Sequence, residues 1–229
     1  RAIPFIQNAV KKDTPFFAVI WFHTPHSPVV GGDKYRAMYQ DHPAPAQHYY
    51  ACVTALDEQV GRLRAELSKL EVANNTMLWF CSDNGPARQG SPRHVGSAGH
   101  LSGYKLSIQE GGIRVPGLLV WPDKIKQPIT VSDPCVTSDY FPTILSSLDI
   151  PLPDDRIYDG LSLWPFIDGK AKERTKPIGF LNKEAKEAVW MRARYKLIST
   201  PKGIQLFDII KDAAEKKDLS KELPAITLT

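Results

Sequence analysis

The chain has 229 residues, a hydrophobic fraction of 42% and a formal net charge of +4. This length is enough to bury a sizeable core, and no apolar run is long enough to span a bilayer. The small positive charge comes without a basic cluster interleaved with aromatic residues, so we expect neither a nucleic-acid partner nor a membrane partner. Cys52, Cys81 and Cys135 show no CxxC spacing and indicate buried free thiols.

Residues 1–13 are predicted to be the last part of a helix. This helix stops before Pro15, because proline cannot continue a helix. Residues 16–22 follow as an unbroken apolar run, and this pattern favours a strand buried on both faces. The run ends in the polar, proline-rich stretch His23-Thr24-Pro25-His26-Ser27-Pro28. His26 is therefore a candidate site residue, although a lone histidine in a loop can equally have no chemical role.

The segment from Ala46 to about Leu70 is the clearest helix, because its apolar residues recur in steps of three and four. They are Tyr49, Val53, Leu56, Val60, Leu63, Leu67 and Leu70. Such a stripe indicates core packing rather than a cofactor site. The helix would make residues 16–83 a strand-helix-strand unit, in which a single helical crossover returns the second strand parallel to the first.

The second strand of this unit is an apolar run that begins at Thr76 and stops at Ser82-Asp83-Asn84-Gly85. Ligands collect outside the carboxyl ends of strands in open α/β sheets, so Asp83 and Asn84 stand where chemistry is usually done. Carboxylate and amide oxygens are hard donors that suit Ca²⁺ or Mg²⁺. If the two strands are close neighbours, His26 lies roughly 5 to 10 Å from this tip. The alternative is that Asp-Asn-Gly only turns the chain.

A long loop follows Gly85 and contains six further glycines and several basic side chains, among them Lys105. Loops of this length inside a compact domain are usually functional or disordered, and this one begins at the predicted metal site, so we expect a function. It is not a phosphate-binding loop, because neither GxGxxG nor GxxxxGK[ST] occurs in the chain. Residues 117–122 then predict a third buried strand.

The sequence predicts that Asp139 caps a helix that runs to about Leu148. Residues 188–199 alternate apolar with basic side chains, and this period of two predicts one strand with a solvated basic face. The alternative is that this basic face borders the substrate entrance. Lys196 belongs to that basic set. Residues 204–210 predict a further strand after a tight turn.

This order of elements predicts an α/β chain with two parts. Residues 1–172 would contain a mainly parallel sheet flanked by helices, incomplete in this chain. Residues 173–229 would form a small antiparallel α+β subdomain at the C-terminus.

Several short motifs occur in a fixed order along the chain. They are Pro25-His26-Ser27-Pro28, Leu56-Asp57-Glu58-Gln59-Val60-Gly61-Arg62, Ser82-Asp83-Asn84-Gly85, Gly103-Tyr104-Lys105, Glu110-Gly111-Gly112-Ile113-Arg114-Val115-Pro116, Asp139-Tyr140-Phe141-Pro142-Thr143-Ile144-Leu145 and Asp159-Gly160-Leu161-Ser162-Leu163. In order and spacing they resemble the sulfatases of the alkaline phosphatase superfamily, of the arylsulfatase and N-acetylgalactosamine-6-sulfatase type. The resemblance covers nearly the whole chain and implies the C-terminal portion of an alkaline-phosphatase-like α/β fold.

The resemblance implies hydrolysis of a sulfate ester, either a sulfated carbohydrate or an aryl sulfate, by a formylglycine nucleophile. It implies that Asp83 and Asn84 supply part of the shell of a Ca²⁺ ion, which is favoured over Mg²⁺. The ammonium of Lys105 would bind the sulfate as a compact point charge. His26 would contact the sulfate and donate a proton to the leaving group. The resemblance also implies an exported protein, whether periplasmic, extracellular or lysosomal.

The family's activation motif, Cys or Ser followed by x-Pro-x-Arg, is absent from this sequence. We therefore expect the formylglycine and the remaining calcium ligands in a missing N-terminal half, and we expect the chain alone to be inactive. Two other functions stay open. One is a phosphonate or phosphodiester hydrolase of the same superfamily, against which the Asp-Asn pair argues mildly, because dinuclear zinc relatives tend to show Asp-His there. The other is a non-catalytic module that binds sulfated glycans.

Overall fold

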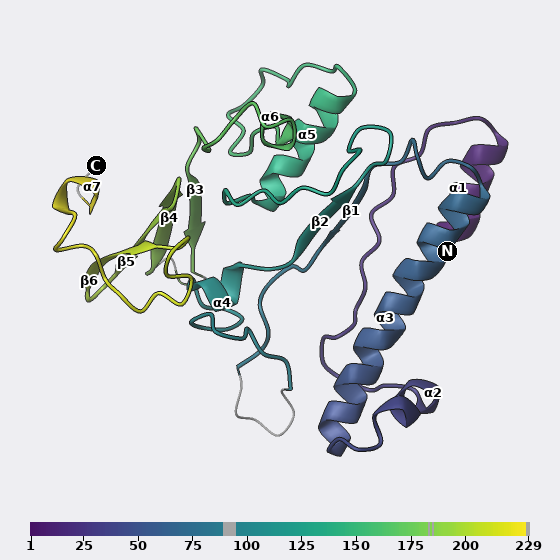
Figure 1. Cartoon of the computed structure of the whole chain (residues 1–229), viewed down its shortest axis with the longest axis horizontal. Coiled ribbons are helices and arrows are strands. Elements are labelled where there is room, and N and C mark those ends of the chain that lie inside the picture. Colours follow the sequence, from purple (N-terminus) through teal and green to yellow (C-terminus); the bar gives the residue numbers. More distant parts are fainter. Residues whose placement is uncertain (89–94, 183, 185, 228–229) are drawn as a thin grey trace. The chain divides into compact units, whose positions relative to one another are not determined.

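The computed structural model describes residues 1–88, 95–182, 184 and 186–227, and Figure 1 traces the chain. The chain divides into two compact units. Residues Arg1–Cys81 and Gly117–Lys126 make up most of the first unit, while Ser82–Arg88, Ala98–Pro116 and Gln127–Thr229 make up the second. The predicted division between residues 172 and 173 stays a prediction.

Within the described part of the chain, none of the helices is both long and apolar enough to cross a membrane. All three cysteines are free. Cys52 is buried as expected, but Cys81 is half-buried and Cys135 is exposed, so the expectation of buried thiols is wrong for these two.

The first unit combines helices with one small sheet. Its elements are α1 (Ala2–Lys11), α2 (Asp33–Arg36), the 3-10 helix η1 (Ala37–Tyr39), α3 (Ala44–Lys69), β1 (Leu78–Cys81) and β2 (Gly117–Val120). Helix α3 confirms the long helix predicted from the apolar stripe, and α1 is tied to it by a hydrogen bond of 2.6 Å from Gln7 Nε2 to Glu66 Oε1. Leu67 of the stripe is buried, whereas Val53 is exposed. The short elements α2 and η1 cover α3 over a limited length, so most of the stripe is half-buried.

The strand predicted at residues 16–22 is wrong for this chain. The segment carries no helix or strand assignment, and it joins neither sheet of the described residues. Phe17, Val19 and Trp21 alternate along it and are 73%, 61% and 91% exposed. A strand forms where a neighbouring backbone can pair its N–H and C=O groups, and no such neighbour lies beside this segment among the described residues. The predicted parallel strand-helix-strand unit is therefore not formed there.

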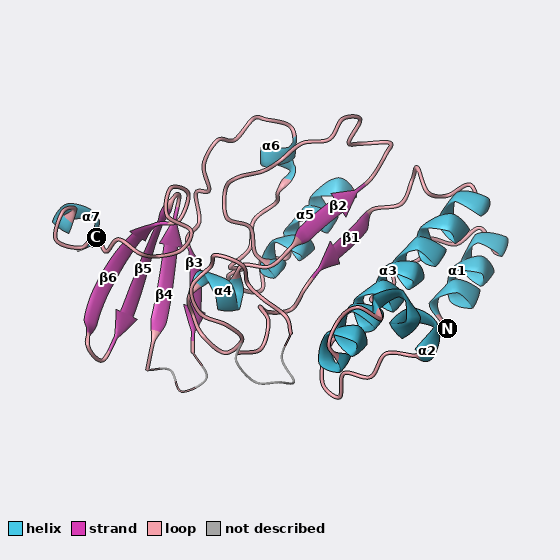
Figure 2. Ribbon diagram, turned by 60° about the horizontal axis from the view of Figure 1, so that its bottom comes forward, coloured by secondary structure: helices cyan, strands magenta, loops and turns pink. Residues whose placement is uncertain are grey.

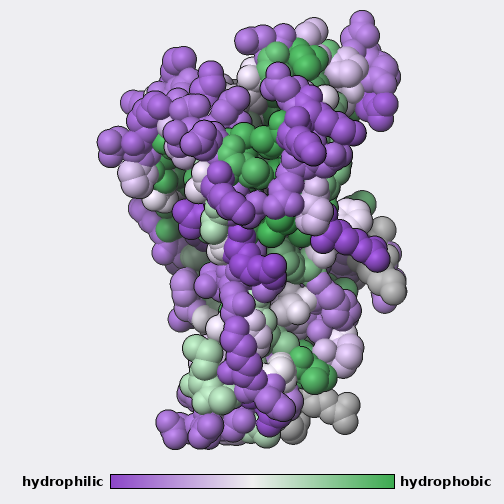
Figure 3. Space-filling model, turned by 90° about the vertical axis from the view of Figure 1, so that its right-hand side faces the viewer, coloured by the Kyte–Doolittle hydropathy of each residue, from purple (hydrophilic) through white to green (hydrophobic). Residues whose placement is uncertain are grey.

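Strands β1 and β2 pair with each other in antiparallel orientation, with Leu78 opposite Val120 and Cys81 opposite Gly117 (Figure 2). This corrects the expected parallel sheet. Burial on both faces is wrong for β2 as well, because Leu118 is 61% exposed. Two strands alone cannot cover both of their own faces. Figure 3 shows one face of the molecule, where hydrophobic areas lie between predominantly hydrophilic ones.

The second unit contains a four-stranded antiparallel sheet in the order β3-β4-β5-β6. Its elements are α4 (Glu110–Ile113), η2 (Thr137–Asp139), α5 (Tyr140–Ser147), α6 (Trp164–Ile167), β3 (Ile178–Leu181), β4 (Ala188–Arg192), β5 (Tyr195–Thr200), β6 (Gly203–Asp208) and α7 (Pro224–Thr227). The sheet confirms the predicted antiparallel C-terminal region. Its core includes Val189, Ile198, Phe207 and Ile108 from the glycine-rich loop, and Ile113 of α4 packs against this core.

The single strand predicted over residues 188–199 is a hairpin in the structure. Ala193 and Arg194 form a turn between β4 and β5, so Met191 pairs with Lys196. Residues paired across two strands share one face of the sheet. Because Met191 is buried, Lys196 is buried with it, at 0% exposure. The expectation that Lys196 belongs to a solvated basic face is therefore wrong.

Asp139 lies at the N-cap position of α5 as predicted, but its side chain makes no capping hydrogen bond to that helix and binds elsewhere. Its Oδ2 accepts a hydrogen bond of 2.9 Å from the backbone N of Val136. Both of its oxygens also face Arg174, whose Nη1 and Nη2 donate at 2.8 Å each. Asp139 is 0% exposed and Arg174 is 3% exposed, so this is a buried bidentate ion pair.

Candidate functional site

Asp83 and Asn84 follow β1 after one intervening residue, Ser82, and lie at the start of the second unit. The tip is folded on itself by local hydrogen bonds. The backbone N of Asn84 donates to Asp83 Oδ1 at 3.0 Å, and Asn84 Nδ2 donates to the carbonyl of Gly85 at 2.8 Å. Asp83 is exposed and Asn84 is half-buried. The turn proposed as an alternative is thus present, and it leaves Asp83 Oδ2 and Asn84 Oδ1 outside these bonds.

Lys105 lies in the same unit, on the loop that returns past this tip. Its backbone N donates to the carbonyl of Pro86 at 2.7 Å. The Lys105 side chain is half-buried, and among the described residues no carboxylate lies within ion-pair distance of its ammonium. The structure therefore brings the loop that carries Lys105 next to the turn at Asp83–Asn84, which we call the tip. We call these two adjoining loops the loop cluster.

The Gly111–Gly112 turn of α4 lies between these two loops. The backbone N of Gly85 donates to the carbonyl of Gly112 at 2.9 Å. On the other side, the backbone N of Gly111 donates to the carbonyl of Ser102 at 2.6 Å. A Cβ at Gly85 would lie 1.8 Å from the Gly111 carbonyl oxygen, so the backbones can approach this closely only because glycine occupies the position.

His26 belongs to the first unit, so its approach to the other three residues stays a prediction. The residue is exposed, and its backbone N donates to the carbonyl of His23 at 2.9 Å, which closes a turn. The rings of His23 and His26 lie 5.5 Å apart between centroids. His26 Nδ1 lies 2.9 Å from the carbonyl oxygen of Ser27. Because a carbonyl oxygen only accepts, we assign the proton to Nδ1, and Nε2 is then the nitrogen free to exchange a proton.

The oxygen donors of Asp83 and Asn84 are of the type that a hard divalent cation prefers, but two donors do not complete its coordination shell. A carboxylate and an amide oxygen on successive residues are typical Ca²⁺ donors, and Ca²⁺ takes six to eight. Among the described residues, no group of three or more His, Cys, Asp or Glu side chains gathers around a common point that could hold a metal. Asp83 and Asn84 therefore fit as part of a metal shell.

Two features of this region were not predicted from the sequence. The Arg88 guanidinium lies 5.6 Å from the centroid of the Tyr104 ring, which places a second cation beside the Lys105 loop. Glu110 of α4 is 3% exposed and faces Lys196 from β5, with 2.9 Å between Oε1 and Nζ. The sequence signal for Glu110 was its place before Gly111-Gly112, but its partner is 86 residues away.

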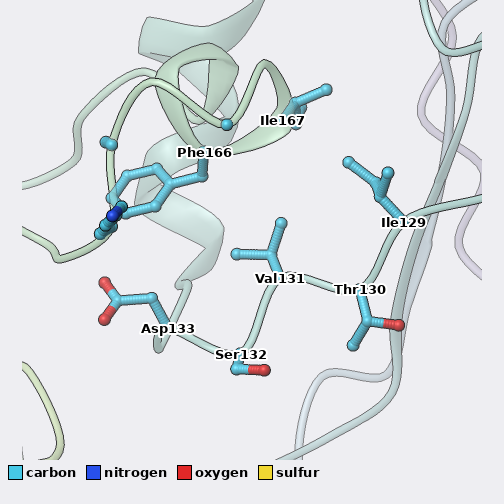
Figure 4. A pocket seen from close by; sticks show the side chains of 10 residues that line it. Ile129, Thr130, Val131, Ser132, Asp133, Phe166 and Ile167 are labelled. Atoms are coloured by element: carbon cyan, nitrogen blue, oxygen red, sulfur yellow. The ribbon is translucent and has the colours of Figure 1, made fainter.

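The second unit also has a hollow of about 320 Å³ whose lining includes Ile129, Val131, Asp133 and Phe166. Figure 4 shows these side chains, with the Asp133 carboxylate beside the Phe166 ring in this view. Burial raises the pKa of the Asp133 carboxyl, and the nearby Arg174 opposes this shift. None of the predicted site residues lines the hollow, so it is separate from the loop cluster.

Comparison with known proteins gives a consistent result. A family model described as Sulfatase matches residues 1–150. Steryl-sulfatase from Homo sapiens is 35% identical over 178 residues, which cover 75% of this chain and 29% of that protein. N-acetylgalactosamine-6-sulfatase from Sus scrofa is 32% identical over 175 residues, which cover 76% of this chain and 33% of that protein. The chain thus spans about a third of the length of these curated relatives.

The fold is also similar to solved structures. Ps i-CgsB in complex with k-i-k-neocarrahexaose matches with a TM-score of 0.89 and 31% identity, over 99% of this chain and 50% of that chain. The two units together therefore correspond to about half of that solved chain.

Proposed function

Because the chain belongs to the sulfatase family, we propose that it is the C-terminal portion of a longer protein that hydrolyses sulfate esters. The supporting observation is the loop cluster of the second unit, in which the backbone bond from Lys105 to Pro86 joins the cation-bearing loop to the Asp83–Asn84 tip. A cation and two hard oxygen donors on adjoining loops suit an anionic group held beside a divalent metal.

Lys105 has the properties that a sulfate-binding group needs. Its ammonium is a compact charge with three donors, so it neutralises a sulfate oxygen without requiring one orientation. Among the described residues no carboxylate pairs with it, and a ligand anion therefore meets no competing internal partner. Lys105 would hold the sulfate in the ground state and offset the charge that develops on its oxygens during ester cleavage.

Asp83 Oδ2 and Asn84 Oδ1 would hold a Ca²⁺ ion together with ligands from an upstream segment. When bound, this ion would supply positive charge against the reacting sulfate. The nucleophile would be a formylglycine, also upstream, because the activation motif is absent from this sequence.

His26 would serve as the proton donor to the leaving alcohol. Its Nδ1–H is held by the Ser27 carbonyl, which orients the ring and leaves Nε2 for the substrate. An imidazole suits this role near neutral pH, and general acid catalysis contributes about 10²- to 10⁴-fold in rate. The proposal requires His26 to reach the loop cluster of the second unit in the complete protein.

The substrate class that we propose is a sulfated carbohydrate or an aryl sulfate. The solved complex of Ps i-CgsB with a ligand named as a neocarrahexaose supports the carbohydrate, since its sequence is 31% identical to this chain. We also propose export from the cytoplasm, which rests on the family likeness alone.

The direct test uses the full-length protein produced together with a formylglycine-generating enzyme and supplied with calcium. Inorganic sulfate and inorganic phosphate are measured over a panel of aryl sulfates, sulfated oligosaccharides, phosphonate esters and phosphodiesters. Sulfate release with turnover supports the proposal. Preferential phosphate release would assign the protein to the phosphonate or phosphodiester hydrolases, and saturable binding of sulfated oligosaccharide without release would assign it to the non-catalytic modules.

A further inference from the structure

The Gly111–Gly112 turn is the common support of the loop cluster. It accepts a hydrogen bond from Gly85 beside the Asp83–Asn84 tip and donates one to Ser102 in the Lys105 loop. Both glycines lack room for a side chain, because a Cβ at Gly111 would lie 2.5 Å from the Ser102 carbonyl oxygen and a Cβ at Gly112 2.2 Å from that of Ser107. A shift of this turn therefore moves both loops.

The turn is fixed by Glu110, the first residue of α4, and Glu110 is held by the C-terminal part of the unit. Lys196 Nζ lies 2.9 Å from Glu110 Oε1 and 2.9 Å from Glu215 Oε1. The backbone N of Glu110 donates to Glu215 Oε2 at 2.8 Å. A second tie runs from Ser102 Oγ to the carbonyl of Ala214. The segment at 214–215 thus holds the Lys105 loop and α4 together.

This cluster is deeply buried, since the side chains of Lys196, Glu110 and Glu215 are 0%, 4% and 2% exposed. Burial raises the pKa of the Glu215 carboxyl, and the Lys196 ammonium opposes that shift. A buried ion pair commonly gives no more stability than apolar side chains of the same volume would. What the ammonium adds over an apolar side chain at this position is a hydrogen bond to Glu110 and an ion pair with Glu215, whose other oxygen accepts from the backbone N of Glu110.

We propose that Lys196 is a positioning residue for sulfate ester cleavage: through Glu110 and Glu215 it fixes the glycine turn on which the Lys105 loop and the Asp83–Asn84 tip rest. This proposal rests on the proposed function. Lys196 contacts no substrate, and its effect on the reaction passes through the placement of Lys105. The small antiparallel sheet then contributes to the reaction indirectly, because its strand β5 carries Lys196.

The first test is a double-mutant cycle in the full-length protein, with kcat for sulfate release as the readout. Lys196→Met keeps the volume of the side chain and removes its charge. We expect a loss of kcat that approaches about 100-fold, the scale of a misplacement of about 1 Å. In a Lys105→Ala background the same substitution should change kcat by less than about 2-fold, because the group that it places is already gone. Equal losses in both backgrounds would overturn the proposal.

The matched control is Arg174→Met, which breaks another buried ion pair of the same unit. Arg174 contacts Asp139 at the start of α5 and, within the described residues, has no hydrogen bond or ion pair with residues 102–112. Any loss of kcat in this variant should be equal in the two backgrounds. If Lys196→Met does not fold, Glu215→Gln, which keeps the shape of the side chain, enters the same cycle with the same expected outcome.

The second test does not depend on activity, so it separates this proposal from the proposed function. Hydrogen exchange is measured for the backbone amides of Gly85, Lys105 and Gly111, which are all bonded within the cluster. We expect faster exchange at all three in Lys196→Met and unchanged exchange in Arg174→Met. Unchanged protection in Lys196→Met would refute the positioning role even if sulfate release is observed. If exchange is faster in Lys196→Met but the full-length protein has no sulfatase activity, the role of Lys196 in fixing the glycine turn stands and the proposed function is rejected.

Discussion

Gly85 is the residue on which the close approach of the tip and the α4 turn depends. A Cβ there would lie 1.8 Å from a carbonyl oxygen of the backbone, which cannot rotate away as a flexible side chain does. We predict that Gly85→Ala lowers the free energy of unfolding of the full-length protein by at least about 3 kcal/mol. Denaturant titration measures this loss.

Gly61 provides the matched control for that substitution. It lies in α3, and a Cβ at this position meets no atom within 4 Å. Gly61→Ala should raise the free energy of unfolding by up to about 1 kcal/mol, because alanine favours the helix. Opposite signs for the two glycines are expected; equal effects would show that the contact at Gly85 is unimportant.

A leaving-group series tests the role of His26. If His26 protonates the leaving alcohol, His26→Ala should lower kcat by about 100-fold or more for alkyl sulfates. The loss should be much smaller for nitrophenyl sulfate, whose leaving group needs no proton. His42→Ala, at an exposed histidine after η1, serves as the control. An equal loss for both kinds of substrate would remove His26 from the acid role.

At the residue scale, sequence reasoning found the polar groups that stand at the ends of apolar runs or inside ordered motifs. Asp83, Asn84 and Lys105 were identified in this way, and the structure brings their loops together. The residues that hold those loops were not found. Glu110 and Lys196 are 86 positions apart, and a buried lysine has the same letter as a solvated one. Only the pairing register of β4 and β5 determines whether Lys196 is buried or solvated.

At the scale of elements, periodicity predicted the long helix α3 and the antiparallel character of the C-terminal region, but it merged β4 and β5 into one strand and gave the wrong sheet partner for β1. Helix α3 was predicted within two residues at its start and one at its end. The segment at 16–22 was predicted as a strand, since its apolar pattern is that of a buried strand, but pairing also requires a neighbour. Long-range pairing is a property of the whole sheet and is not encoded in a local run.

The buried pair of Asp139 and Arg174 joins the start of α5 to the segment before β3. We predict that Arg174→Ala lowers the free energy of unfolding by about 3–5 kcal/mol, because it leaves the Asp139 carboxylate buried without its cation. The exposed pair of Lys170 and Asp168 is the comparison. Lys170→Ala should change stability by no more than about 0.5 kcal/mol. A loss below about 1 kcal/mol in Arg174→Ala would contradict the importance of the pair.

At the scale of the whole molecule, the chain spans about a third of its curated relatives, and among the described residues the proposed Ca²⁺ site has only the two donors Asp83 and Asn84. We predict that the chain alone binds Ca²⁺ weakly, because two donors cannot replace the hydration shell of the ion. Isothermal titration calorimetry measures this affinity. A tight stoichiometric site would contradict the proposal that Asp83 and Asn84 need upstream ligands.

The most direct test of sulfate ester hydrolysis at this loop cluster is kcat for sulfate release by the full-length protein with and without the Lys105 ammonium. We predict that Lys105→Ala lowers kcat by about 100-fold or more, because a group that offsets transition-state charge is lost. Lys202→Ala, in the exposed turn between β5 and β6, should leave kcat unchanged. Turnover by Lys105→Ala within about 2-fold of the unmodified protein would contradict the assignment of this loop cluster as the sulfate-binding site.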